Sequence, residues 1–187
     1  GIAAADDNTD LKSAYFELLL ADGRLEEAQS LVREIFGDDV AALPPSFQRY
    51  YHHQMGLVRS LEGELEESLR EFDLSIALAD GSNYDWNHVF ALTMSAFLNQ
   101  HLGHAEAAQA RLAESEAVVR RARVNGVDSP DIYYTESIIA LLNARKQEAV
   151  EALDAAYERG WRQAWVLKVD RRLQALRDQP AFIELEQ

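Results

Sequence analysis

The chain has 187 residues, of which 48% are apolar and 27% charged, a composition typical of a folded globular domain. Its 32 acidic and 18 basic residues give a formal net charge of −14, which disfavours nucleic acid as a partner because phosphate binding requires a surplus of Lys and Arg. The chain has no cysteine, which excludes disulfides, thiol catalysis and thiolate metal sites. No apolar run reaches the roughly 18–20 residues that a membrane span requires.

Apolar residues recur at helical spacing in the first half of the chain and predict two pairs of helices. The first pair spans residues 11–21 and 25–35, and the second spans residues 47–61 and 65–79. A glycine stands at the turn within each pair, and prolines precede the second pair, where they favour the start of a helix. The first predicted helix has one apolar stripe, formed by Leu11, Tyr15, Leu18 and Leu19.

The second half of the chain repeats this plan. The third pair is predicted at residues 87–102 and 105–123, and the fourth at residues 131–143 and 147–159. No segment alternates at period two over a useful length, so no strand is predicted. We expect an all-α fold in a single domain over residues 1–187, with repeats at about 10–40, 46–80, 87–123 and 131–159 and a cap at 160–187.

An internal repeat connects the helix pairs. Gly23, Gly63 and Gly103 stand 40 residues apart, and each is followed five residues later by a small residue, namely Ala28, Ser68 and Ala108. In the fourth pair Ala144 takes the place of the turn glycine and Ala149 that of the small residue. Gly56 and Ala96 stand seven residues before a turn glycine. Glycine within a helix costs about 1 kcal/mol relative to alanine, so we expect the backbone of the paired helix to approach closely at Gly56.

The second pair carries the pattern Gly56-x6-Gly63-x-Leu65-x2-Ser68-x3-Phe72. This pattern resembles the core of the tetratricopeptide repeat, with small residues where helices touch, a glycine at the turn and an aromatic residue in the second helix. The first and third pairs keep the same frame. The resemblance implies a right-handed superhelix of stacked antiparallel helix pairs, a TPR-like α-solenoid of four pairs plus a C-terminal cap. The period of 40 departs from the family's usual length of about 34 residues.

A second resemblance lies in the C-terminal segment, which carries Gly160, Trp161, Trp165, Leu167, Asp170, Leu173, Leu176, Pro180 and Phe182. This tail is similar to the end of repeat domains attached to bacterial winged-helix regulators, adenylate cyclases and serine/threonine kinases, in which it caps the last repeat. The resemblance implies the interaction or sensory module of a bacterial signalling or transcription-regulatory protein. We expect the chain to be a part of a longer protein, with the effector domain on its N-terminal side. Bacterial cytoplasm and periplasm both stay open.

Candidate catalytic and metal-binding residues have simpler explanations. His52 and His53 are adjacent, and adjacent helical side chains point about 100° apart, so they cannot both face one ion without a third ligand. Carboxylate pairs such as Glu26 and Glu27 stand in the first turn of a predicted helix, where the helix dipole favours them. The chain carries no nucleophile elbow, phosphate-binding glycine loop or dinucleotide fingerprint. We therefore expect no enzymatic activity, no metal and no cofactor.

The first helix of each pair lines the concave face of a tetratricopeptide superhelix, and the turn glycines set its phase. The residues expected to point inward are Tyr50, His53, Leu57, Phe90, Thr93, Phe97, His101, Tyr134, Ile138 and Leu141. This lining is aromatic and apolar, and it lacks the Lys, Arg and Asn with which some family members hold a C-terminal carboxylate. We expect it to bind an amphipathic helix or an extended apolar segment of a protein or peptide partner. An error of one residue in phase places the same side chains in the core, and that interpretation also stays open.

Two further functions stay open beside peptide binding. The domain could self-associate and so set the geometry of an effector as a homodimer. Alternatively, the aromatic inner wall could enclose a small apolar effector molecule. None of these functions involves nucleic acid or a membrane span in this segment.

Overall fold

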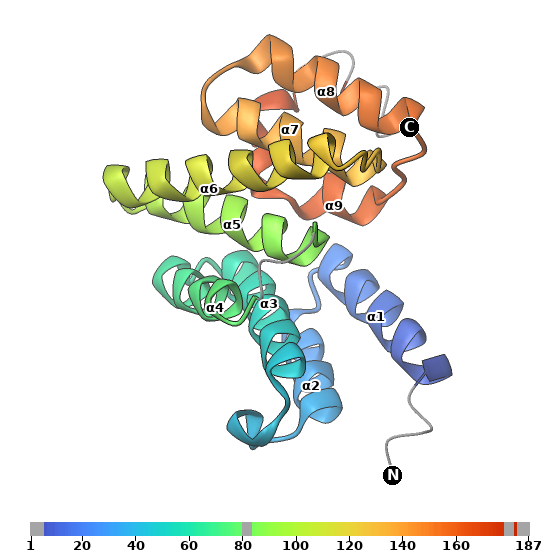
Figure 1. The fold of residues 1–187 in the computed structure, drawn as a ribbon. Coiled ribbons are helices and arrows are strands. Elements are labelled where there is room, and N and C mark those ends of the chain that lie inside the picture. The colour runs from blue at the N-terminus through green and yellow to red at the C-terminus, as the bar shows by residue number, and fades with distance from the viewer. Residues whose placement is uncertain (1–5, 80–83, 178–181, 183–187) are drawn as a thin grey trace.

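The computed structural model describes residues 6–79, 84–177 and 182 of the chain. The fold of this part is built from helices. They pack as four adjacent antiparallel pairs (Figure 1). The pairs are α1 (Asp6–Ala21) with α2 (Leu25–Phe36), α3 (Pro45–Glu62) with α4 (Leu65–Ala77), α5 (Trp86–His101) with α6 (Ala105–Val124), and α7 (Pro130–Leu142) with α8 (Lys146–Glu158). No described residue lies in a strand. The predicted all-α fold and its helix pairs are therefore confirmed.

Shorter elements complete the described chain. A 3-10 helix, η1 (Val40–Ala42), precedes α3, and the C-terminal segment contains α9 (Ala164–Val169) and a second 3-10 helix, η2 (Arg171–Leu176). Residues 80, 178–181 and 183–187, which include the end of the second predicted repeat and of the predicted cap, lie outside the described residues.

The turns within the pairs share one backbone geometry. Gly23, Gly63 and Gly103 have φ angles of 70°, 84° and 80°, in the left-handed region that suits glycine. At the turn after α3 the N–H of Glu64 donates to the carbonyl of Arg59 at 3.0 Å, and the N–H of Gly63 donates to that of Ser60 at 3.2 Å. These two bonds form a Schellman motif, which satisfies the last carbonyls of the helix. The period of 40 in the sequence is thus a repeat of helix C-caps.

The small residues of the repeat lie where paired helices touch. Ala28, Ser68, Ala108 and Ala149 are all buried, with at most 2% exposure. The expectation for Gly56 needs correction, because the group that approaches it is a side chain of the paired helix rather than its backbone. A Cβ atom placed at Gly56 would lie 3.0 Å from three ring carbons of Phe72 in α4. The aromatic residue of the pattern therefore packs on the glycine of the same pattern.

The apolar stripe expected on the first helix is only partly buried. Leu19 is buried, but Leu11, Tyr15 and Leu18 are 69%, 43% and 61% exposed. The buried face of α1 is instead formed by Phe16, Leu19 and Leu20. Its neighbours explain the difference, because α1 packs against both α2 and α9 and the face that reaches both is rotated from the predicted stripe.

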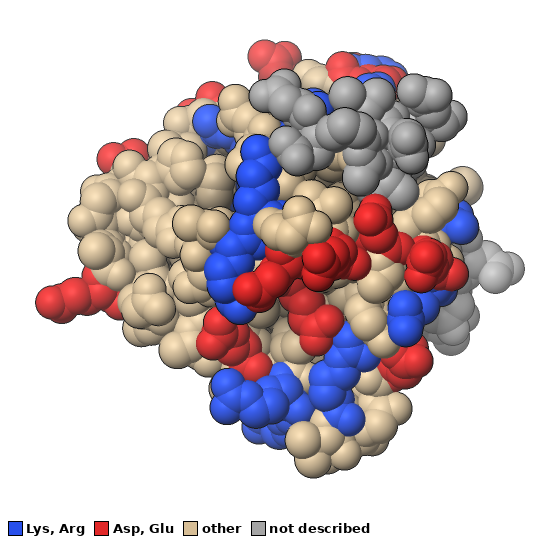
Figure 2. All heavy atoms as spheres, turned by 90° about the horizontal axis from the view of Figure 1, so that it is seen from above, with Lys and Arg blue, Asp and Glu red and all other residues tan. Residues whose placement is uncertain are grey.

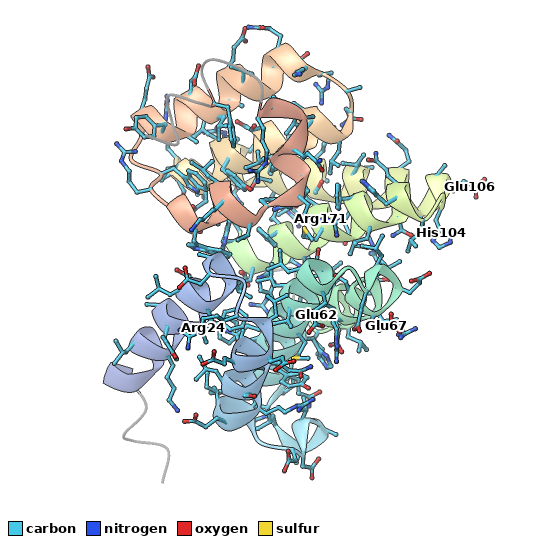
Figure 3. All side chains as sticks on the ribbon, turned by 180° about the vertical axis from the view of Figure 1, so that it is seen from behind. Arg24, Glu62, Glu67, His104, Glu106 and Arg171 are labelled. Atoms are coloured by element: carbon cyan, nitrogen blue, oxygen red, sulfur yellow. The ribbon has the colours of Figure 1, made fainter. Side chains whose placement is uncertain are left out.

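The C-terminal segment does more than cover the last pair. Its helix α9 packs against α1, at the opposite end of the chain, and η2 packs against α7 (Figure 1). Arg171 at the start of η2 donates to the carbonyl of Ser60 in α3 at 3.1 Å (Figure 3). Helices of the first, second and fourth pairs therefore all contact the C-terminal segment.

Candidate functional site

The ten side chains expected on the concave face are divided among three environments. Tyr50, His53, Leu57 and Phe90 line one cavity. Phe97, His101 and Leu141 line a second cavity of about 370 Å³ beside η2. Thr93, Tyr134 and Ile138 are at most 1% exposed and lie beneath or beside the C-terminal segment. The ten side chains therefore do not form one continuous surface, and their binding role stays a prediction.

An ion pair fixes the C-terminal segment in this position. Arg172 and Asp170 have side chains that are 1% and 2% exposed, and Arg172 Nη2 lies 2.6 Å from Asp170 Oδ2. Arg172 Nε donates to Asp170 Oδ1 at 2.9 Å, and Arg172 Nη1 donates to Thr93 Oγ1 of α5 at 2.5 Å. The Tyr134 hydroxyl of α7 donates to Asp170 Oδ2. The guanidinium also lies 4.1 Å above the centre of the Phe90 ring. We call Asp170, Arg172, Tyr134 and Thr93 the buried network.

Protonation in the buried network follows from this geometry. Burial raises the pKa of Tyr134 well above its usual value, and the charge of Asp170 raises it further, so the phenol stays a donor. Burial acts to lower the pKa of Arg172, but Asp170 opposes it and the net shift is upward. The arginine is therefore charged, and its bonds to Asp170 and Thr93 anchor the segment.

The first cavity, which we call the N-terminal pocket, has a volume of about 140 Å³. It is enclosed by α1, α3, α5 and the start of the C-terminal segment. Its lining consists of Ser13, Phe16, Glu17, Tyr50, His53, Gln54, Leu57, Trp86, Asn87, Phe90, Gln163 and Trp165. Aromatic rings thus come from four separate elements, and a lining rich in aromatic side chains is typical of ligand pockets.

Several polar groups of the N-terminal pocket lack a partner. Within the described residues His53 Nδ1, Gln54 Oε1 and Trp165 Nε1 are buried without a hydrogen bond. Each such group costs about 1–3 kcal/mol, so a cluster of three in one lining needs an explanation. Burial lowers the pKa of His53 from 6.5 to about 4, so its ring is neutral near pH 7 and can accept a hydrogen bond.

The sequence indicated part of this pocket and missed the rest. The four residues from α3 and α5 were expected to face inward, whereas Trp86 and Trp165 were not among the residues expected there. Residues of α1, such as Glu17, were missed because the predicted stripe of that helix was rotated. The only available signal was the density of aromatic residues, which does not say which elements meet.

Other kinds of site are not supported by the described residues. They contain no group of three His, Asp or Glu side chains that could hold a metal ion. None of the helices they form is long and apolar enough to cross a lipid bilayer. Comparison with known protein families, with curated proteins and with solved structures finds no match to this chain.

Proposed function

We propose that the chain is a non-catalytic recognition module, a TPR-like right-handed superhelix that binds a protein or peptide partner. The four helix pairs support this proposal, because they repeat the same C-cap geometry and the same buried small residue in each unit. Scaffolds of stacked helix pairs present extended surfaces for partners rather than reactive groups. The resemblance of the tail supports the proposal that the module belongs to a bacterial signalling or transcription-regulatory protein.

The observation that carries the proposal is the N-terminal pocket. Because the buried network holds the C-terminal segment against Thr93 and Tyr134, these residues are not available to a partner helix. The N-terminal pocket is open instead, and its aromatic walls suit a single anchoring side chain. A few such anchors supply most of the affinity in peptide recognition. The proposal is therefore a short linear partner whose anchor enters this pocket.

The charge distribution supports a protein partner over nucleic acid. Figure 2 shows basic side chains lying next to acidic ones on one face of the molecule rather than in a broad basic patch. Arg123 pairs with Glu136 at 2.8 Å and Arg145 pairs with Glu148 at 2.7 Å. Paired arginines have little free charge for phosphate.

Selection of a random peptide library on the immobilised protein tests the proposal. Purified peptides from the selection should bind the unaltered chain, and Tyr50→Ala should weaken them by about tenfold or more, as loss of an anchor contact does. Val124→Ala, at a residue that is 82% exposed on α6, is the control and should leave binding unchanged. Selected peptides that ignore the Tyr50 substitution, or the absence of any binding peptide, would contradict the proposal.

Self-association is the second candidate function, and the exposed stripe of α1 favours it. Leu11, Leu18 and Tyr15 form an apolar face that no described residue covers. Light scattering over a range of concentrations should show a dimer that Leu18→Glu returns to the monomer mass of 21.1 kDa. A monomer at every concentration rejects this candidate and leaves peptide binding in place.

A further inference from the structure

We propose that the N-terminal pocket binds an organic ammonium group, held by its aromatic walls and by the carboxylate of Glu17. This inference deepens the proposed function by naming the chemistry of the anchor. The ammonium belongs either to a lysine side chain of the partner or to a free amine of similar size.

The size of the pocket limits the ligand. A cavity of about 150 Å³ holds a molecule the size of benzene, and the N-terminal pocket has about 140 Å³. A butylammonium group, which is also the end of a lysine side chain, has this size. The volume limits the group that the pocket holds, and the rest of a larger ligand must lie outside it.

The aromatic walls favour a cation. Trp86 and Phe90 in α5 have ring centres 5.6 Å apart, and Phe90 lies 5.4 Å from the ring of His53. Phe16, Tyr50 and Trp165 complete the lining from three other elements. Aromatic faces attract ammonium groups through their quadrupole, most strongly where water is excluded. Several rings around one small space are the arrangement that recognises such cations.

The polar groups of the pocket have the matching charge and hydrogen-bonding capacity. Glu17 is a half-buried carboxyl whose pKa is raised by burial, and no described residue forms an ion pair or hydrogen bond with it. Gln54 Oε1 and the Nδ1 atom of neutral His53 are also acceptors without donors, but both atoms are buried beneath the wall of the pocket, so Glu17 is the acceptor that a ligand reaches. An ammonium group provides the positive charge and the hydrogen-bond donors that Glu17 lacks. The unpartnered N–H of Trp165 is a donor, so an ammonium group cannot form a hydrogen bond with it. Trp165 contributes the face of its ring instead.

The arginines near the pocket do not fill it, although the guanidinium of Arg172 covers one face of the Phe90 ring at 4.1 Å. No Lys or Arg side chain lines the cavity. Arg49 is paired with Asp85, and Arg172 is paired with Asp170 in the buried network. Each of these two cations is therefore neutralised by its own carboxylate, whereas Glu17 is not. The net charge of −14 adds a long-range field that attracts cations to the whole molecule.

The test uses nuclear magnetic resonance of the three indole N–H groups while n-butylammonium chloride is added to the full chain. The signals of Trp86 and Trp165, which line the pocket, should shift, whereas Trp161, stacked on Tyr134 at 4.5 Å, should not. 1-Butanol, a neutral molecule of similar shape, should bind at least about tenfold more weakly, because it lacks the charge-assisted hydrogen bonds.

Variants separate the role of Glu17 from general charge effects. Glu17→Gln should weaken binding of n-butylammonium by about tenfold or more. Glu158→Gln, which removes an exposed carboxylate of α8, should leave it unchanged at the same net charge. Unaltered helical circular dichroism of both variants shows that the fold is kept. Equal binding of 1-butanol, or equal binding by the Glu17 variant, would overturn the inference.

A second arm identifies the source of the ammonium group. The peptide acetyl-Gly-Lys-Gly-amide is compared with the same peptide acetylated on the lysine Nε. Binding of the first alone supports a lysine anchor, and binding of n-butylammonium without either peptide supports a free amine. If selected peptides occupy the pocket but neither ammonium probe does, the ammonium inference fails while the proposed function stands.

Discussion

One residue in the repeat departs from its local backbone preference. Ala144 has a φ angle of 58°, at the position where the other three pairs have glycine. It makes the same two C-cap bonds, since its N–H donates to Leu141 at 2.9 Å and that of Arg145 donates to Ala140 at 2.8 Å. The left-handed conformation costs a residue with a Cβ atom roughly 1–2 kcal/mol. The fourth pair therefore keeps the turn at the expense of strain in one alanine.

Relief of this strain gives a testable change in stability. Ala144→Gly should raise the free energy of unfolding by up to about 1 kcal/mol, after the larger entropy of the unfolded glycine is subtracted. Gly63→Ala should lower it by a similar amount, because the space beside Gly63 is open and only the backbone conformation opposes the new methyl group. Urea denaturation measures both. Shifts in the same direction for the two substitutions would contradict this account.

Residue patterns in the sequence predicted the turns better than they predicted which face of each helix is buried. A glycine at the end of a helix reports a local backbone angle, so the turns at Gly23, Gly63 and Gly103 were correct. The pocket depends on rotation of α1 about its axis, and a shift of one residue turns a helical side chain by about 100°. Glu17 could therefore not be assigned from its neighbours in the sequence.

At the level of elements, a serine hydroxyl forms a hydrogen bond to the backbone of the paired helix in two of the four pairs. Ser68 Oγ of α4 donates to the carbonyl of Gly56 in α3 at 2.8 Å, and Ser137 Oγ of α7 donates to that of Ala149 in α8 at 2.7 Å. In both pairs the bond joins the residue seven positions before the turn residue to the residue five positions after it. The donor lies in the second helix of one pair and in the first helix of the other. Small residues let the helices approach closely enough for this, and the third pair has Ala96 and Ala108 there.

The contacts of the C-terminal segment were the least predictable from the sequence. Its composition indicated a cap, and Trp161, Leu173 and Leu176 do belong to the core around α7 and α8. Nothing in the neighbouring sequence indicates that Arg172 reaches Thr93, which lies 79 positions away. Contacts of such long range depend on the whole arrangement of helices and leave no periodic signal.

The buried network predicts an unequal response to two neighbouring arginine substitutions. Arg172→Met should lower the free energy of unfolding by about 3–5 kcal/mol, because it leaves the Asp170 carboxylate buried without its cation. Asp170→Asn combined with Arg172→Met should recover part of this loss, since no buried charge remains. Arg171→Met is the control, and this exposed residue should cost no more than about 1 kcal/mol.

Urea denaturation of the four proteins gives the required free energies. The double variant must be more stable than Arg172→Met alone if the uncompensated charge is the cause. Equal losses for Arg171→Met and Arg172→Met would show that the buried network does not anchor the segment.

At the level of the whole molecule, the C-terminal segment connects parts that a simple stack of repeats leaves independent. In a linear array each pair contacts only its neighbours, so loss of a terminal cap weakens mainly the last unit. Here α9 packs on α1, and Arg171 and Arg172 bond to α3 and α5. The folding of the first pair should therefore depend on residues more than 140 positions away.

Removal of residues 160–187 tests this dependence. The described part of that segment buries Trp161, Val166, Leu167, Leu173 and Leu176, each at most 6% exposed. Burial of one such side chain is worth about 1.5–3 kcal/mol, so the loss approaches the total stability of a small domain, about 5–15 kcal/mol. Hydrogen exchange should show protection lost in α1 and α3 as well as in α7 and α8. Protection that persists in the first two pairs would show instead that the segment acts on the last pair alone, as a cap of a linear array does.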